Sequence, residues 1–142
     1  MLNATLIAPT RSRSVVDFLA RPTGVEVYSQ VPHLEHRIAI PTEWPQEAIL
    51  ATDDPFGLPP LELITPHVLQ FSGTRLKELV VTPRGVRLVC KLGECSRAHY
   101  AAFREIRFEQ ADLDPGFARD TLDAAIALFE SLATSEPHSR VA

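Results

Sequence analysis

The chain has 142 residues, of which 45% are hydrophobic and 23% are charged, and this composition excludes a wholly disordered protein. Its net charge of −4 at pH 7 argues against a nucleic-acid-binding domain, which usually carries a basic excess. Twelve prolines stand against only six glycines, so we expect turns that are fixed by proline and no glycine-rich phosphate-binding loop.

The first elements along the chain are predicted to be an arm, a helix and a hairpin. Residues 1–13 lack periodicity, and we expect a loose N-terminal arm there. Ser14 fits a helix N-cap and apolar residues follow it, so the pattern predicts a short helix that ends before Pro22. Alternating apolar and polar side chains over residues 25–31 and 36–40 predict the two strands of a hairpin.

The middle of the chain gives weaker patterns. Residues 46–60 form the least regular stretch and contain several turn-forming residues. Residues 61–64 and 68–71 resemble short strands, and Pro66 separates them.

The clearest local signal is a second hairpin. Residues 77–81 are rich in β-branched and apolar side chains, and residues 86–92 alternate apolar with polar or small ones. Thr82-Pro83-Arg84-Gly85 between them fits a type I turn, with proline at its second position and glycine at its fourth. The composition of residues 96–111 fits a helix, yet a strand fits the segment equally well, because its periodicity does not decide.

The last element is predicted to be a long amphipathic helix. Asp114 can cap its N-terminus, and Pro115 suits the first helical position. Its apolar stripe comprises Leu122, Ala125, Ile126, Phe129, Leu132 and Ala133, widened by Phe117, Thr121, Ala124 and Leu128. Pro137 ends the helix, which leaves residues 137–142 as a frayed tail.

Together these elements predict one α+β domain over residues 14–136. We expect a mainly antiparallel sheet of about six or seven short strands, because the predicted strands cluster centrally instead of alternating with helices. A short N-terminal helix and the long C-terminal helix would pack on this sheet. No apolar run approaches the roughly 20 residues that span a bilayer, and the N-terminus has no secretory signal, so we expect a cytoplasmic protein without a membrane segment.

Three possible zinc ligands lie within ten residues: Cys90, Cys95 and His99. A structural zinc site needs a fourth ligand, which His33 or His36 would have to supply. A redox pair of the two cysteines is a second alternative, since a hairpin loop between them would make them cross-strand neighbours. The interpretation we favour is that Cys90 packs in the core, because it shares a strand face with apolar residues.

Other polar clusters have simpler explanations. The two histidines of residues 33–36 are too close together for a zincin motif and suit an exposed loop. The carboxylate pairs at 53–54 and 112–114 could bind a divalent cation, but they stand where turns and helix caps favour aspartate. No catalytic or cofactor-binding motif is present in the sequence, so we lean towards a protein without enzymatic activity.

The sequence leads to three functional hypotheses, of which a protein-binding adaptor, chaperone or regulator comes first. Homodimerisation is expected as well, because the broad apolar helix face is large for so short a chain. The residues expected to contact a partner are Trp44, Phe56, Leu58 and Leu128.

The other two hypotheses concern different ligands. In one, a small-molecule-binding protein or minor enzyme has its pocket between the sheet and the C-terminal helix, with His67, His99 or Tyr100 as polar groups. In the other, phosphate or nucleic acid binds to residues 75–108, which hold eight cationic against three acidic side chains. The sequence argues against nucleic acid as a partner, because the aromatic residues interleaved with these arginines fit a core as well as a binding surface.

Overall fold

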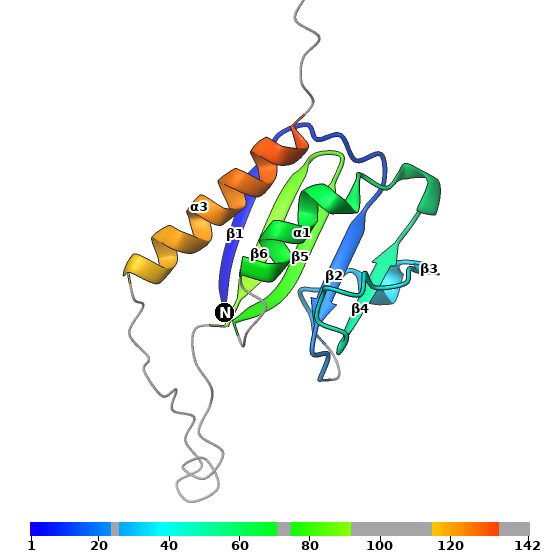
Figure 1. Ribbon diagram of the computed structural model, residues 1–142, viewed down its shortest axis with the longest axis horizontal. Coiled ribbons are helices and arrows are strands. Elements are labelled where there is room, and N and C mark those ends of the chain that lie inside the picture. Colours follow the sequence, from blue (N-terminus) through cyan, green and yellow to red (C-terminus); the bar gives the residue numbers. More distant parts are fainter. Residues whose placement is uncertain (24–25, 71–74, 92–114, 134–142) are drawn as a thin grey trace, which may run out of the picture.

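The computed structural model describes residues 1–23, 26–70, 75–91 and 115–133, and it shows an α+β fold with one antiparallel sheet (Figure 1). Six strands lie in the order β1-β6-β5-β2-β4-β3. The strands are β1 (Leu2–Ile7), β2 (Val16–Ala20), β3 (His36–Arg37), β4 (Ala48–Thr52), β5 (Leu76–Thr82) and β6 (Gly85–Cys90). The helices are α1 (Leu61–Gln70) and α3 (Pro115–Leu132), and two short 3-10 helices are η1 (Val31–His33) and η2 (Pro55–Gly57).

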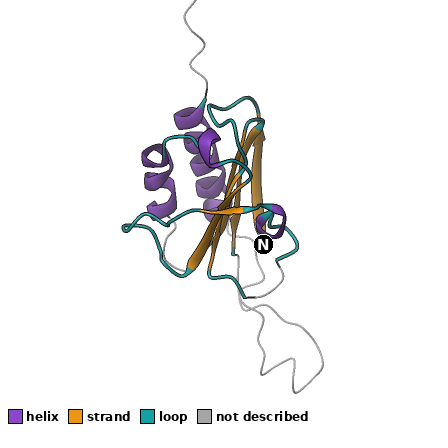
Figure 2. Cartoon of the chain, turned by 90° about the vertical axis from the view of Figure 1, so that its right-hand side faces the viewer, coloured by secondary structure: helices purple, strands orange, loops and turns teal. Residues whose placement is uncertain are grey.

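Both α-helices cover the same face of the sheet (Figure 2). The core lies between them and the strands, where Phe18, Leu79 and Leu88 are fully buried. Trp44 closes the core near β2, with its ring 5.2 Å from that of Phe18 in an edge-on arrangement. None of the described helices is long and apolar enough to cross a membrane.

The predicted hairpin is confirmed as β5 and β6, and Leu92, the last residue predicted for it, lies outside the described residues. Thr82 pairs with Gly85 across the turn, and the Thr82 hydroxyl accepts a hydrogen bond of 3.1 Å from the Arg84 backbone N–H. Gly85 is required there because a Cβ atom at this position would overlap the carbonyl oxygen of Leu6 in β1. The turn is therefore both a hairpin closure and a close contact with the neighbouring strand.

The predicted C-terminal helix is confirmed as α3, but its buried stripe is rotated from the expected one. The side chains that face the sheet and α1 are Thr121, Ala124, Ala125, Leu128 and Leu132. Leu122 and Ile126, which were expected in the stripe, are 47% and 37% exposed. The small side chains of Thr121, Ala124 and Ala125 allow the helix to approach the sheet closely, while Leu128 and Leu132 fill the core.

Two predictions for the N-terminal part are wrong. Residues 1–13 are not a loose arm throughout, because β1 occupies Leu2–Ile7 and pairs along its full length with β6. The short N-terminal helix is absent from the described chain, and β2 lies at Val16–Ala20 instead. All five residues of β2 are buried, so the strand lacks the alternation that would distinguish it from a helix.

The other differences lie between residues 25 and 71. Residues 26–31 form no strand among the described residues, and β3 pairs with β4 instead of with them. The irregular stretch contains β4, and the two strands expected around Pro66 are one helix, α1. Proline cannot donate a backbone hydrogen bond within a helix. The burial of Ile64 and Val68, which lie four residues apart on one face of α1, offsets this loss at Pro66.

Several predictions concern residues outside the described part of the chain. These are the helix-or-strand segment 96–111, the ligand candidates Cys95 and His99, the pocket candidate Tyr100, residues 92–108 of the basic segment, the carboxylates Asp112 and Asp114, and the tail 137–142.

Candidate functional site

The face of the sheet opposite α1 and α3, here called the open face, is crossed by residues 26–34, here called the strap. Val31 and Leu34 of the strap are buried and pack on Leu19 of β2 and Ala51 of β4. These four residues form a second, smaller hydrophobic cluster, so the strap covers the β2–β4 part of the open face.

Charged side chains from the sheet hold the strap by hydrogen bonds. Asp17 Oδ2 of β2 accepts bonds from the Ser29 hydroxyl at 3.1 Å and from the Gln30 backbone N–H at 2.8 Å. Arg87 Nη2 of β6 donates to the carbonyl oxygen of Tyr28 at 2.7 Å. Backbone groups of the strap that lack partners in a sheet or helix are thereby satisfied by side chains.

A buried ion pair secures the start of the strap. Lys77 Nζ lies 3.4 Å from Glu26 Oε1 and also donates to the carbonyl oxygens of Ala20 and Arg21. Burial by itself would raise the pKa of Glu26, but hydrogen bonds from Thr23 and the charge of Lys77 lower it. Glu26 is therefore ionised at neutral pH and compensates the buried ammonium group.

Beneath the strap, Asp17 and Glu78 form a buried pair of carboxyl groups. Asp17 pairs with Val80 and Leu19 pairs with Glu78, so the two acids are diagonal neighbours on β2 and β5. Both are fully buried. Asp17 Oδ1 and Glu78 Oε1 have no other hydrogen-bond partner among the described residues.

The pair holds a proton. Burial, together with a hydrogen bond to Asp17 and the charge of Asp17, raises the pKa of Glu78 to about 9, while the charge of Arg87 opposes the shift. Near neutral pH Glu78 is therefore protonated, and its O–H can donate to Asp17, which explains the two oxygens that lack another partner. Arg87 Nη2 lies 3.2 Å from the second oxygen, Glu78 Oε2.

We expect Glu78→Gln to flatten the pH dependence of stability. Between the ordinary carboxyl value of 4.5 and about 9, folded Glu78 binds more protons than unfolded Glu78, so its contribution to stability falls as pH rises. Glutamine imitates the protonated acid and cannot ionise. Urea unfolding at about pH 6 and about pH 9 should show a smaller decline in the variant than in the parent.

The matched control for that variant is Glu62→Gln, since Glu62 is exposed on α1. Its pH dependence should equal that of the parent. A Glu78→Gln protein that loses as much stability as the parent over this range would show that Glu78 is not the group that retains the proton.

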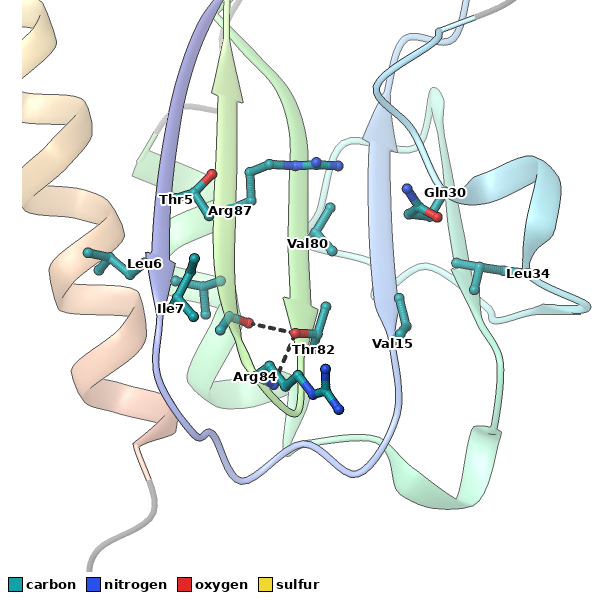
Figure 3. Close-up of a pocket in the computed structure, with 12 residues that line it drawn as sticks. Thr5, Leu6, Ile7, Val15, Gln30, Leu34, Val80, Thr82, Arg84 and Arg87 are labelled. Carbon is teal, nitrogen blue, oxygen red and sulfur yellow. Dashed lines mark hydrogen bonds between the residues drawn. The ribbon is translucent and has the colours of Figure 1, made fainter.

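A groove of about 480 Å³ lies on the open face beside the strap (Figure 3). This volume is within the usual range of ligand-binding sites. Its apolar side chains include Ile7, Val15, Leu34 and Val80. Its polar side chains are Thr5, Gln30, Thr82, Arg84 and Arg87.

The two arginines of the groove differ in their surroundings. Arg87 reaches from β6 across β5 towards β2, where it contacts Glu78 and the strap (Figure 3). Arg84 lies at the β5–β6 turn, and its exposed guanidinium group makes no hydrogen bond or ion pair to the part of the chain that the structure describes. The groove therefore offers positive charge beside an apolar floor.

The four residues expected to contact a partner do not share a surface. Trp44 and Leu128 are buried in the core, and Leu58 is half-buried against the same core. Phe56 is 89% exposed, and the Asp54 side chain caps the 3-10 helix that holds it. Leu128 packs within its own subunit, so it does not lie on the surface where a second subunit would bind.

The sequence-predicted ligand candidates also lie apart from the groove. Cys90 is a free, buried cysteine of the core, and burial raises the pKa of its thiol. His67 lies between the helices, 3.3 Å from the Ser131 hydroxyl, and burial lowers its pKa. The groove is on the opposite face of the sheet from the predicted pocket. His33 and His36 are exposed, and the described residues hold no group of three potential metal ligands.

The carboxylates Asp53 and Asp54 serve local structure. Asp53 accepts a hydrogen bond of 2.8 Å from the Val15 backbone N–H. Asp54 accepts one of 2.9 Å from the Phe56 backbone N–H at the start of η2. Both roles agree with the interpretation of these residues as turn and cap residues.

Sequence reasoning missed the cluster of Asp17, Lys77, Glu78 and Arg87. The available signal was a charged residue inside an apolar run, as in Val15–Ala20, where Asp17 interrupts five apolar neighbours. Charged residues are rarely buried fully unless they are paired, so a charge at such a position indicates a partner elsewhere in the fold.

No known protein family, curated protein or solved structure matches this chain. A functional argument therefore depends on the geometry and charge of the open face.

Proposed function

We propose that the protein is a non-enzymatic binding module that holds an acidic and apolar segment of a partner protein in the groove. The observation that carries this proposal is the combination of an apolar floor with two arginines, and the guanidinium group of Arg84 has no partner among the described residues. Carboxylates of a partner would pair with the arginines while its apolar side chains contact Val80 and Ile7.

The shape of the site favours a protein segment over a small molecule. The groove is open to solvent and spans β1, β6 and β5 up to the strap. It continues into the outward side chains of edge strand β1, where Asn3 and Thr5 are exposed and Ile7 is 86% exposed. An extended segment can place alternate side chains along such a surface.

The position of the carboxyl pair supports binding without catalysis. Asp17 and Glu78 are fully buried under the strap, so neither carboxyl group can contact a ligand in the groove directly. A general acid or base must reach the proton that it transfers. The hydrogen bonds of Asp17 instead fix the strap that forms one wall of the groove.

The proposal is tested with two tetramethylrhodamine-labelled peptides of about ten residues, one alternating Glu with Val and the other alternating Lys with Val. Fluorescence anisotropy should show binding of the Glu peptide and much weaker binding of the Lys peptide. We expect Arg84→Ala to lower the affinity for the Glu peptide by up to about fivefold, which corresponds to the loss of one exposed ion pair. Arg119→Ala, an exposed change on α3, is the control and should leave the affinity unchanged.

Two results would contradict the proposal. Equal affinity for both peptides would show that the arginines do not select charge. Failure of both peptides, together with binding of octanoate, would favour a small-molecule site on the open face. A cytoplasmic location and a homodimer stay predictions from the sequence. Leu122 and Ile126 of α3 are exposed and are the residues available for a dimer interface.

A further inference from the structure

Arg87 links the groove to the buried carboxyl pair. Its side chain lines the groove, while its Nη2 atom lies 2.7 Å from the Tyr28 carbonyl oxygen and 3.2 Å from Glu78 Oε2. Glu78 in turn contacts Asp17, which holds the strap. A change of charge at the pair therefore changes how much of the Arg87 charge is available to a ligand.

We infer that the proton shared by Asp17 and Glu78 keeps Arg87 available to acidic groups in the groove, so that loss of this proton weakens the binding of an acidic partner. This inference rests on the proposed function and adds a regulation to that same site. It makes Glu78 a positioning residue, which acts on the ligand through Arg87.

The contact between Arg87 and Glu78 couples the carboxyl pair to the groove. Arg87 Nη2 lies 3.2 Å from Glu78 Oε2, within hydrogen-bond reach of either a neutral or an ionised carboxyl group. A protonated Glu78 accepts this bond through a neutral oxygen and leaves the Arg87 charge largely uncompensated. An ionised Glu78 would form a buried ion pair with Arg87 and compete with any carboxylate in the groove.

Two other titratable groups near Glu78, Tyr28 and Glu26, keep their protonation state while the pair loses its proton. Tyr28 stays neutral because burial, with the charges of Glu26, Glu78 and Asp17, raises its pKa to about 12. Glu26 has a lowered pKa and is paired with Lys77 beside the pair. The described groove lining contains no histidine.

The test is the affinity of the Glu–Val peptide between about pH 7 and about pH 10, measured on the full chain. The parent protein should lose up to about fivefold in affinity as Glu78 ionises, and Glu78→Gln should keep the affinity nearly constant. Arg84→Ala should bind more weakly but retain the parent's pH dependence, because Arg84 does not contact Glu78.

A readout without ligand tests the proton itself. Carbon-13 NMR of glutamate-labelled protein should show the Glu78 carboxyl resonance, assigned by its loss in Glu78→Gln, still protonated at about pH 7 and titrating near pH 9. An ionised Glu78 at neutral pH would overturn the inference even if the peptide binds. So would a parent affinity that is constant over this range, or an equal decline in Glu78→Gln. Absence of peptide binding at pH 7 would instead contradict the proposed function, and the inference with it.

Discussion

Replacement of Leu128 by alanine is expected to lower the free energy of unfolding by about 2–5 kcal/mol. Leu128 is fully buried where α3 packs on the sheet, so truncation would leave a cavity that the packed strands cannot close. Urea unfolding, monitored by circular dichroism, should show a lower midpoint with an unchanged slope.

Leu122→Ala is the matched control on the same helix, since Leu122 is 47% exposed. It should lower the free energy of unfolding by less than about 1 kcal/mol. Equal losses for the two variants would contradict the observed orientation of α3. Because Leu128 belongs to the core, a charged substitution there would unfold the protein, and Leu122 is the better position for testing self-association.

Gly85→Ala is expected to lower the free energy of unfolding by about 1–3 kcal/mol and to weaken the pairing of β1 with β6. The added Cβ atom would overlap the backbone carbonyl oxygen of Leu6, and a backbone group cannot rotate aside as a side chain can. The strand would have to separate from β6, where Leu6 pairs with Val86. Compared with the parent protein, Gly85→Ala should therefore accelerate hydrogen exchange more at the β1 amides than at the β2 amides.

Thr5→Ala provides the comparison within β1, because Thr5 is exposed on the open face. Its effect on stability should be a few tenths of a kcal/mol. If Gly85→Ala were as mild as Thr5→Ala, the close approach of β1 and the hairpin turn would be refuted.

The elements that the sequence predicts correctly are those with local signals. The β5–β6 hairpin is predicted by turn residues 82–85 between two strand-like runs. The helix α3 is predicted by a long apolar stripe of helical period with a proline at its start. The strand β2 and the helix α1 were missed because buried β2 has no alternation and Pro66 resembles a break. The structure of β2 depends on pairing with β4 and β5, and that of α1 on packing against the core.

The candidate site was less accessible to sequence reasoning. Its charged residues come from β2 (Asp17) and from the β5–β6 hairpin (Glu78 and Arg87), which are distant from each other in the chain, and the strap adds a third segment. No short sequence motif predicts such an arrangement. What the sequence contains is single charged residues inside apolar runs, which indicate buried pairing but not the identity of the partner.

The measurement that tests the account most directly is an amide chemical-shift map of the nitrogen-15-labelled protein with the Glu–Val peptide. Binding in the groove predicts shifts in β1, β5, β6 and the strap, with the outer surface of α3 unchanged. Shifts centred on Leu122 and Ile126 of α3, or the same pattern with the Lys–Val peptide, would contradict an acidic segment bound on the open face.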